Sequence, residues 1–562
     1  MNPETHASIV RSLTQKHLSV SFTFIPPDAQ EVTQLSRWLI EVLCLDEGLV
    51  TDHQNGGDIS ENGRLAATFL KCLVSFSRLL LELGRLPVFD QPKVISLEIQ
   101  SGASGSYGVR VSFPVIDLIS SAVYKHVITV AIKLSRWAGQ NQITEHTRAI
   151  FFETIKQEAV KPLERMIPSG KSTIPVLMAA HSLGIPYMHL GWGVYQLGWG
   201  SKSRRMDRST TDLDTAIGAK LSHNKVAAAC LLRMAGLPAP LHLVAYKEAD
   251  AITAAKRIGF PVVVKPSDLD RGEGVTVDVN DESMLKSAFE CAHKLARSKQ
   301  VIIEQQVEGV CHRLFIANGK LLYAIKRLPM SVKGDGLGNV EQLVKSEIEK
   351  QHGMPPWRRT EIEPIDDIAL ASIQRAGFRL DSVPPDGVLV PLRRIESTIW
   401  GGVDEEVSHR IHPENLSLVV RAADLFGLHV AGIDIITPDI AVPWYENGAI
   451  INEVNFAPLF GGGEISRRYI PVFLKDFIDG NGRIPVEVFE GDDAVNRARI
   501  RKAELTSQGL RCFLTTAALT INAKGMRLSM KSVGLQDRVK ALICHRDVDS
   551  IIVIASTSSD QK

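Results

Sequence analysis

The sequence predicts a multidomain protein that combines α/β and α+β domains. A length of 562 residues exceeds what one hydrophobic core supports and suggests three or four domains. A content of 44% hydrophobic and 23% charged residues is that of a soluble globular protein. Apolar residues follow the two-residue period of strands in some segments and the 3.6-residue period of helices in others. We expect an N-terminal α+β domain at residues 1–165, a large domain at 166–480 and a small α/β domain at 481–562.

Charge and cysteine content exclude several classes of function. A net charge of +1 argues against a nucleic-acid or membrane-surface binder, so neither partner is expected. The seven cysteines form no C-x-x-C pair and the N-terminus has no signal-peptide pattern, which predicts a reduced, cytoplasmic setting. The most apolar segment, residues 65–83, contains Lys71, Arg78 and Glu82. It therefore predicts a core helix and not a membrane span.

The N-terminal 165 residues predict helices around two alternating strands. Residues 32–45 and 64–83 have a helical period, whereas residues 92–100 and 107–115 alternate as strands do. A long helical region is expected over residues 116–167. No pattern in this part indicates a particular chemistry.

Two short polar segments each allow two interpretations. Residues 168–173, Pro-Ser-Gly-Lys-Ser-Thr, lack the full frame of a phosphate loop, so a helix N-cap by Ser172 or Thr173 is favoured, and a substrate contact stays open. Residues 196–200, Gln-Leu-Gly-Trp-Gly, precede a basic run that includes Lys202. An anion-binding turn and a plain hairpin fit this second segment equally well.

A phosphate-binding cover is predicted from residue 222 onward. Lys225 opens an amphipathic helix, and Lys265 ends the apolar strand Pro-Val-Val-Val-Lys-Pro. A loop with Gly272 and Gly274 then leads into a strand at residues 275–279. Glycines let backbone N–H groups approach phosphates, and a lysine neutralises their charge. The combination is suited to a flexible cover over a triphosphate.

Residues 301–309, Val-Ile-Ile-Glu-Gln-Gln-Val-Glu-Gly, predict an apolar strand that breaks into a short polar linker suited to an adenine edge. Glu304 can accept a hydrogen bond from the exocyclic amine while Val307 presents its main chain. An Asn-Gly hairpin is expected at residues 312–329, with Lys326 and Arg327 at the end of its second strand. A mobile loop is expected at residues 332–336, and Arg393 follows a later apolar strand.

A metal site is predicted on residues 429–458. This stretch predicts two apolar strands, and Asn447-Gly448 indicates a hairpin turn between them. Glu453 and Asn455 are two residues apart and therefore face the same side, and Asp434 comes opposite them if the strands pair. Two carboxylates and an amide oxygen suit Mg²⁺ held partly by nucleotide phosphates. A solvated hairpin is the alternative, but unpaired carboxylates within apolar strands are costly.

Taken in order, these motifs resemble the ATP-grasp fold and, more narrowly, the cyanophycin synthetase family. The resemblance is carried by the segments YQLGWGSKSRRM, GFPVVVKP, AIKRLPMSVKGDG, HPENLSLVVRAADLFGL, AGIDIITPDI and ENGAIINEVNFAP, and is strong over residues 170–484. It implies that ATP and two Mg²⁺ ions bind, the ions at Asp434, Glu453 and Asn455. The implied nucleotide contacts are Lys225, Lys265, Gly272, Gly274, Glu304, Gln305, Val307 and Glu308. The implied catalytic set is Arg393, Lys265, Lys326 and Arg327, and the implied assembly is a homodimer or homotetramer.

Three departures from the family pattern change what the resemblance implies. Cys311 stands where the family has an acidic ribose-binding residue, a contact that Glu308 can replace. Trp400 would reshape the acceptor pocket, which makes the family's polymer primer a doubtful substrate. Residues 491–495 lack the phosphate-loop lysine and instead carry Asp492 and Asp493, which repel phosphate. We expect the tail to be a degenerate Mur-ligase-like remnant that binds no ATP.

Two functions from different classes follow from these observations. The first is an ATP-dependent ligase that forms an amide bond between amino acids or small peptides through an acyl phosphate, releasing ADP and phosphate. The second is a non-catalytic nucleotide-binding or assembly subunit that pairs with a separate ligase. The set of Asp434, Glu453 and Asn455 favours the enzyme.

Overall fold

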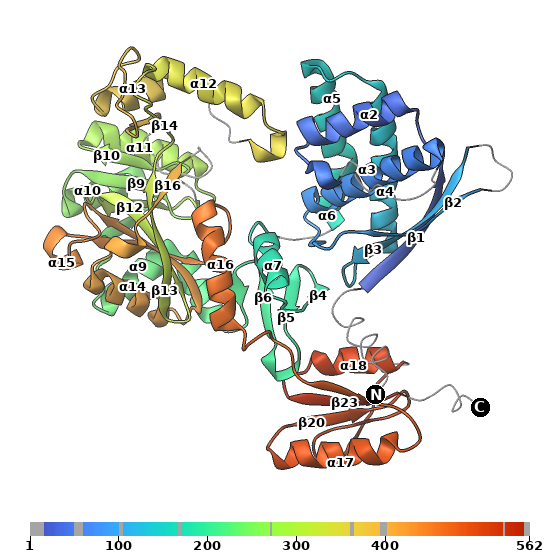
Figure 1. Ribbon diagram of the computed structural model, residues 1–562. Helices are drawn as coiled ribbons and strands as arrows, with labels where there is room; N and C mark the ends of the chain where they lie inside the picture. The colour runs from blue at the N-terminus through green and yellow to red at the C-terminus, as the bar shows by residue number, and fades with distance from the viewer. Residues whose placement is uncertain are drawn as a thin grey trace. The chain divides into compact units, whose positions relative to one another are not determined.

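The computed structural model describes residues 16–49, 60–100, 105–166, 170–269, 272–359, 365–393, 402–531 and 534–555. The chain forms two compact units (Figure 1). Unit 1 comprises residues 1–208, 460–462 and 470–562, and unit 2 comprises residues 209–459 and 463–469. No helix among the described residues is both long and apolar enough to cross a membrane.

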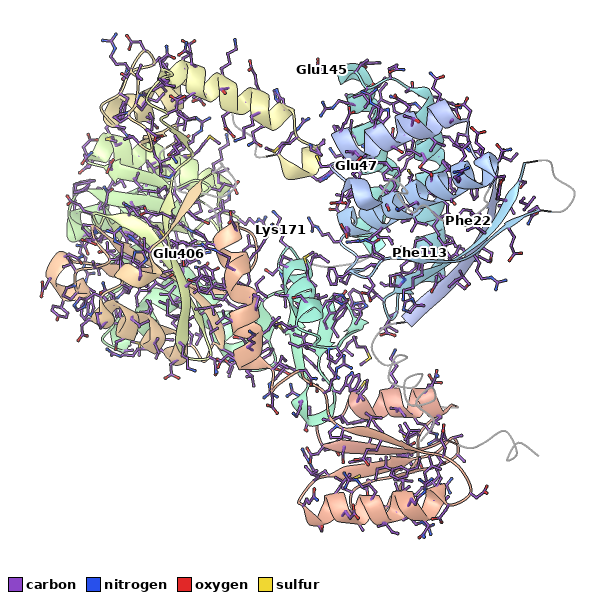
Figure 2. All side chains as sticks on the ribbon, in the orientation of Figure 1. Phe22, Glu47, Phe113, Glu145, Lys171 and Glu406 are labelled. Atoms are coloured by element: carbon purple, nitrogen blue, oxygen red, sulfur yellow. The ribbon has the colours of Figure 1, made fainter. Side chains whose placement is uncertain are left out.

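The N-terminal part of unit 1 is a three-stranded antiparallel sheet with helices packed on one face. The sheet has the order β1-β3-β2, with β1 Lys16–Phe24, β2 Lys93–Ile99 and β3 Tyr107–Val115. The helices are α2 Ala29–Arg37, α3 Glu61–Leu83, α4 Ser121–Gln140, α5 Glu145–Ile155 and α6 Lys161–Met166. Trp38 packs against Phe151 at 4.8 Å between ring centroids, and Phe113, labelled in Figure 2, is also fully buried. Both predicted strands are confirmed, whereas β1 was not predicted.

The rest of unit 1 contains a small sheet and the C-terminal α/β layer. The small sheet follows helix α7 Thr173–Ser182 and contains β4 Tyr187–Gly191, β5 Val194–Leu197 and β6 Arg204–Asp207. The C-terminal sheet has the order β19-β23-β20-β21-β22 and parallel pairing at its first three strands. Its strands are β19 Val486–Phe489, β20 Cys512–Thr515, β21 Thr520–Ile521, β22 Arg527–Leu528 and β23 Ser550–Ile554. Helices α17 Ala494–Ser507 and α18 Leu535–Ile543 cover its opposite faces (Figure 1).

The N-cap prediction at residues 172 and 173 is only half right. Ser172 occupies the N-cap position of α7, but its side chain forms no capping bond to the helix. Its hydroxyl instead accepts a hydrogen bond from the backbone N–H of Phe460 at 2.9 Å. Thr173 is the first residue of the helix. The serine therefore joins two segments of unit 1 that are distant in sequence.

Unit 2 contains two larger antiparallel sheets, each with its own hydrophobic core. The first has the order β10-β9-β11-β8 and consists of β8 His242–Ala245, β9 Val262–Pro266, β10 Thr276–Val279 and β11 Val301–Gln305. Helices α10 Glu248–Ile258 and α11 Glu282–Leu295 pack on it through small and branched residues such as Ala255, Val264 and Leu285.

The second sheet of unit 2 has five strands in the order β16-β13-β12-β17-β18. They are β12 Val310–Ala317, β13 Lys320–Leu328, β16 Val403–Glu406, β17 Val430–Thr437 and β18 Ile450–Phe456. One face carries Leu314, Ile433 and Val454, which are buried in a core with helices α9 Lys225–Met234 and α14 Pro413–Leu425. Because side chains alternate along a strand, the residues between these apolar positions face the other side of the sheet.

A third, smaller core and several short elements complete unit 2. Strands β14 Ser331–Lys333 and β15 Leu389–Pro391 pair and pack with helices α12 Val340–His352 and α13 Asp367–Arg375. The mobile loop predicted at residues 332–336 is therefore partly a strand. The remaining elements are β7 Thr210–Thr211, α8 Ala216–His223, α15 Trp444–Asn447 and α16 Glu464–Phe477, which begins in unit 2 and ends in unit 1.

The two predicted Asn-Gly turns have different outcomes. Asn318 and Gly319 both have positive φ, 50° and 68°, and close the β12–β13 hairpin as predicted. The prediction for Asn447-Gly448 is wrong. Residues 444–447 form the one-turn helix α15, and Gly448, with φ 73°, ends that helix in the left-handed conformation. The glycine is left-handed in both settings, so the dipeptide cannot distinguish a helix end from a tight hairpin.

Candidate nucleotide and metal site

The register of the five-stranded sheet aligns charged residues across the face that lies opposite the core with α9 and α14. Glu406, Ile325, Arg313, Asp434 and Glu453 are paired in succession from one edge strand to the other. All five lie in unit 2. The row carries three carboxylates and one guanidinium. A folded sheet tolerates such a row only if the charges are paired or bind a ligand.

Asp434 is at the centre of this face and is almost fully buried. Its two carboxylate oxygens accept hydrogen bonds from Nε and Nη2 of Arg313, each at 2.6 Å. Asn455 donates to Asp434 from its side-chain amide at 3.3 Å. Burial alone would lower the pKa of Arg313, but the charge and hydrogen bonds of Asp434 raise that pKa above its usual range. Asp434 and Asn455 are thus close together, as the strand pairing predicted.

Gly432 allows the close approach of Pro458 beside Arg313. A Cβ at Gly432 would lie 2.9 Å from Cβ of Pro458 and 3.5 Å from both Cδ and Nε of Arg313. Gly432 pairs with Asn455 in the neighbouring strand, and this pair is adjacent to the pair of Asp434 and Glu453 on the same sheet face. A side chain here would displace Pro458, while its contact with Arg313 would be an ordinary van der Waals one.

Lys225 and Glu453 meet at the β18 edge. Asn224 caps helix α9 by accepting from the backbone N–H of Ala227 at 2.9 Å, and this places Lys225 on the first turn. The ammonium of Lys225 lies 3.8 Å from a carboxylate oxygen of Glu453. It also donates to the backbone oxygen of Leu269 at 2.8 Å, next to the glycine loop. One cation therefore links the predicted metal ligand to the predicted phosphate cover.

In the first sheet, Lys265 and Glu304 form a largely buried ion pair. The two strands align Ile302 with Lys265, and the ammonium of Lys265 lies 2.8 Å from a carboxylate oxygen of Glu304. The predicted phosphate lysine and the predicted adenine acceptor are therefore neighbours. The Glu304 carboxylate has lone pairs left for an exocyclic amine, because an ionised carboxylate accepts about four hydrogen bonds.

The linker and the glycine loop around this pair have the expected backbone freedom. Gly272 and Gly274 both have positive φ, at 79° and 70°. The side chain of Gln306 accepts from the backbone N–H of Asp278 at 2.6 Å and so ties the linker to β10. Val307 and Glu308 follow directly, before Gly309, whose φ is 134°. The segments that sequence reasoning joined into one nucleotide site thus belong to the same unit.

Two of the predicted catalytic residues are placed differently from the others. Lys326 pairs in register with His312 and alternates with Arg327, so it faces the opposite side of the sheet from Arg313 and Asp434. Arg393 belongs to the third core of unit 2, where it donates to Asp366 at 3.1 Å. Lys326 and Arg393 therefore do not lie on the sheet face of Arg313 and Asp434. The geometry gives no support to the catalytic roles predicted for them. Trp400 lies outside the described residues.

Sequence reasoning missed Arg313 and Asp404. Arg313 follows His312 at the start of a strand that was correctly predicted, but its partner Asp434 is 121 residues away. Asp404 is opposite Arg327 on the edge strand β16. Only the pairing of β12, β13, β16 and β17 shows that these residues share a face with Asp434. Strand alternation was the available signal, since it separates Arg313 and Arg327 from the core positions.

The donor set fits Mg²⁺ if phosphate oxygens complete the coordination. Asp434, Glu453 and Asn455 offer oxygen ligands, which Mg²⁺ prefers, and Mg²⁺ commonly binds one or two carboxylates together with nucleotide phosphates. Within the described part of the chain, no group of three His, Cys, Asp or Glu side chains is arranged to hold a metal by itself. This set has two carboxylates, so protein atoms alone would leave the ion incompletely coordinated.

The fold and this site define a class of protein. Residues 224–313 match the family model described as "Carbamoyl-phosphate synthase L chain, ATP binding domain". The match covers helix α9, the whole first sheet and the start of β12. This part of the chain therefore has the ATP-grasp fold, within a multidomain α/β and α+β architecture.

More narrowly, the chain is a relative of the cyanophycin synthetases. It is 34% identical over 339 residues to cyanophycin synthetase from Trichormus variabilis, which covers 58% of this chain and 37% of that protein. It is 32% identical over 304 residues to the enzyme from Geminocystis herdmanii, covering 54% of this chain and 35% of that protein. The chain thus matches about a third of the length of these relatives.

Glutathione-forming proteins are also similar. A bifunctional glutathione biosynthesis protein from Mannheimia succiniciproducens is 29% identical over 262 residues, covering 44% of this chain and 34% of that protein. The crystal structure of a bifunctional glutathione synthetase from Pasteurella multocida superposes with a TM-score of 0.43 at 22% identity, over 63% of this chain and 52% of that chain.

Proposed function

We propose that the chain is an ATP-dependent carboxylate–amine ligase that joins amino acids or small peptides through an amide bond. The observation that carries the proposal is the shared face of Asp434, Glu453 and Asn455, with Lys225 and Arg327 directed at it. Similarity to cyanophycin synthetases and glutathione-forming proteins supports the same class of reaction. The proposal includes ATP as the phosphoryl donor and Mg²⁺ as the metal ion.

Each residue has a defined part in the proposed reaction. Lys225 and Lys265 bind the phosphates of ATP, and the linker from Glu304 to Glu308 binds adenine and ribose. Asp434, Glu453 and Asn455 would hold Mg²⁺, which supplies charge neutralisation at the transferring phosphoryl group. Arg327, whose Nη1 is 4.0 Å from Asp434, extends the cationic set on this face toward β16.

The bond changes follow from this arrangement. A substrate carboxylate attacks the γ-phosphorus, and the bond to the β-phosphate oxygen breaks, which leaves ADP and an acyl phosphate. An amine then attacks the acyl carbon, a C–N bond forms, and phosphate leaves with the electron pair of the C–O bond and takes up the proton that the amine nitrogen loses. The glycine loop at residues 272–274 excludes water from the acyl phosphate. Each positioned cation contributes about 3 kcal/mol to lowering the barrier.

The Arg313–Asp434 pair must change when the site is filled. Both oxygens of Asp434 now accept from Arg313, so a metal at Asp434 has to share the carboxylate with the guanidinium. We therefore assign Arg313 a positioning role at Asp434, in addition to the predicted catalytic set.

The test combines ADP release with product identification. Pooled amino acids and dipeptides are incubated with ATP and Mg²⁺, and products are identified by mass spectrometry. We expect a mass that corresponds to loss of water between two pool members, and its disappearance in Glu453→Ala. Exposed Glu446, on α15, gives the matched control Glu446→Ala, which should retain activity. Nucleotide binding without turnover of any carboxylate would instead favour the non-catalytic assembly subunit.

The domain division, the silent tail and the oligomer also belong to this proposal. The boundaries at residues 165 and 480 follow the sequence patterns, and the tail contributes packing within unit 1, where Lys540 pairs with Asp117. Helix α17 begins at Ala494, directly after the two aspartates that argue against phosphate binding. A homodimer or homotetramer is proposed from the family resemblance.

A further inference from the structure

Four carboxylates lie on the face of the five-stranded sheet opposite the core with α9 and α14. Three of them lie within 4 Å of the cationic group of an arginine or a lysine. Asp434 accepts two hydrogen bonds from Arg313, and Glu453 lies 3.8 Å from Lys225. Glu406 lies 2.7 Å from Arg468. The fourth, Asp404, forms no hydrogen bond and no ion pair with another described residue.

Glu406, on the same strand β16 as Asp404, is a carboxylate with several hydrogen-bond partners. It accepts from Ser408 at 3.3 Å and from the hydroxyl of Tyr469, and the hydrogen bond from Tyr469 is the main reason its pKa lies below the usual range. Tyr469 stacks on Tyr323 at 5.2 Å between ring centroids, and Tyr323 donates to Ser466 at 2.9 Å. Glu406, labelled in Figure 2, is thus fixed by α16 and serves the structure.

Asp404 is in the opposite situation, two residues earlier on the same face. It is paired with Arg327 in the strand register, and burial raises its pKa while the charges of Arg327 and Arg313 act against that rise. The side chain of Arg327 is directed toward Asp434, at 4.0 Å, and its Nε is buried with no hydrogen-bond partner among the described residues. An anion is therefore expected at Arg327. The neighbouring Asp404 interacts with the charge of Arg327 but forms no hydrogen bond and no ion pair with a described residue.

Asp404 is too far from the metal ligands to complete their set. It lies on one edge strand, β16, whereas Glu453 and Asn455 lie on the other, β18. Three strand spacings separate β16 from the strand of Asp434, which is about 14 Å between backbones. Arg327 and Arg313 project between the two groups, so the arrangement from β18 to β16 is metal ligands, then cations, then one carboxylate.

We propose that Asp404 binds a positively charged group of the amine substrate and so selects cationic amines for the ligase. This inference rests on the proposed function. The free amine is protonated near neutral pH, and Lys225, Arg313 and Arg327 would repel it from a face that must receive it. Asp404 supplies the missing negative charge beside Arg327, which faces the acyl phosphate in the proposed reaction.

The test is a competition for the acyl phosphate in one reaction. Hydroxylamine is uncharged near neutral pH, is a strong nucleophile toward acyl phosphates and gives a hydroxamate. Reactions contain ATP, Mg²⁺, the pool of amino acids and dipeptides, and a fixed amount of hydroxylamine. Mass spectrometry then gives the ratio of amide product to hydroxamate.

In Asp404→Asn we expect this ratio to fall about ten- to a hundredfold, the range for losing a hydrogen bond to a charged group. Total ADP release in the presence of hydroxylamine should stay near the wild-type value, and Asp404→Glu should recover part of the ratio. Glu405→Gln is the matched control, because Glu405 is adjacent on β16 and faces the opposite side. It should leave the ratio unchanged.

Two results would overturn the inference while leaving the ligase intact. One is an unchanged ratio in Asp404→Asn with both yields kept, and the other is an unchanged ratio because the amide and hydroxamate yields fall equally. If the wild-type protein releases no ADP with either the substrate pool or hydroxylamine, the proposed function is overturned and this inference with it. The hydroxamate yield therefore distinguishes the two failures.

Discussion

At the scale of single residues, the Arg313–Asp434 pair is the feature on which the site depends. Both partners are largely buried, with side-chain exposures of 15% and 4%, and two hydrogen bonds of 2.6 Å join them. Taking two charges out of water is costly, and a bidentate geometry compensates for it only while both partners are present. The pair therefore holds Asp434, the proposed metal ligand, in a fixed position in the absence of a metal.

We expect Arg313→Met to lower the free energy of unfolding by about 3–5 kcal/mol, because it leaves the Asp434 carboxylate buried and unpaired. Adding Asp434→Asn should recover much of that loss. Chemical denaturation of wild type, both single variants and the double variant measures the coupling. Arg468→Met, at an exposed partner of Glu406, is the control and should cost at most about 1 kcal/mol. Strictly additive losses in the double variant would show that the pair is not coupled.

His312 makes the free energy of unfolding depend on pH, and the sign of this dependence follows from the direction of its pKa shift. Burial is the main reason that its pKa lies below the usual value of 6.5. The unfolded chain then binds a proton at higher pH than the folded chain, so the contribution of His312 is complete above pH 6.5 and is lost as the pH falls below it. We expect His312→Gln to flatten the decline of unfolding free energy below that pH. A decline that is equally steep in the variant would contradict this assignment.

At the scale of elements, two glycines with positive φ lie at the two ends of strand β12. Gly309 directly precedes β12 with φ 134°, and a Cβ there would overlap the carbonyl of Thr437. Gly319, in the β12–β13 turn, has φ 68°, and a Cβ added there would have no atom within 4 Å. The two glycines thus meet crowded and open surroundings, respectively.

Gly319→Ala should cost about 1–2 kcal/mol, the cost of a left-handed conformation for a residue with a side chain. Gly309→Ala should cost clearly more, because the Thr437 backbone must also move. Parallel denaturation curves of the two variants measure the difference. Equal losses would mean that the β12–β17 pairing yields without strain, contrary to the register.

Local patterns predicted most elements, because they depend on nearby residues. Strand alternation predicted β2 and β3, and the Asn318-Gly319 turn formed as expected. The error at Asn447-Gly448 has a physical cause. A left-handed glycine after asparagine is compatible with both a hairpin and a helix end, and only the packing of α15 decides between them.

At the scale of the whole molecule, the predicted site depends on long-range pairing that sequence does not specify. Asp434, Glu453 and Asn455 were found because their strands are close in sequence and their spacing reveals a shared face. Arg313 and Asp404 were missed because their partners are brought close only by the order of the five strands. The separation of Lys326 from Arg327 onto opposite faces follows from the same pairing.

The central claim is that Asp434, Glu453 and Asn455 hold Mg²⁺ against the phosphates of ATP. Calorimetric titration of the full chain with a non-hydrolysable ATP analogue, with and without Mg²⁺, tests it most directly in wild type and Glu453→Gln. We predict that Mg²⁺ strengthens binding to the wild type and that this gain is lost in Glu453→Gln, while metal-free binding is retained. An equal gain from Mg²⁺ in both proteins would place the ion elsewhere and contradict the claim.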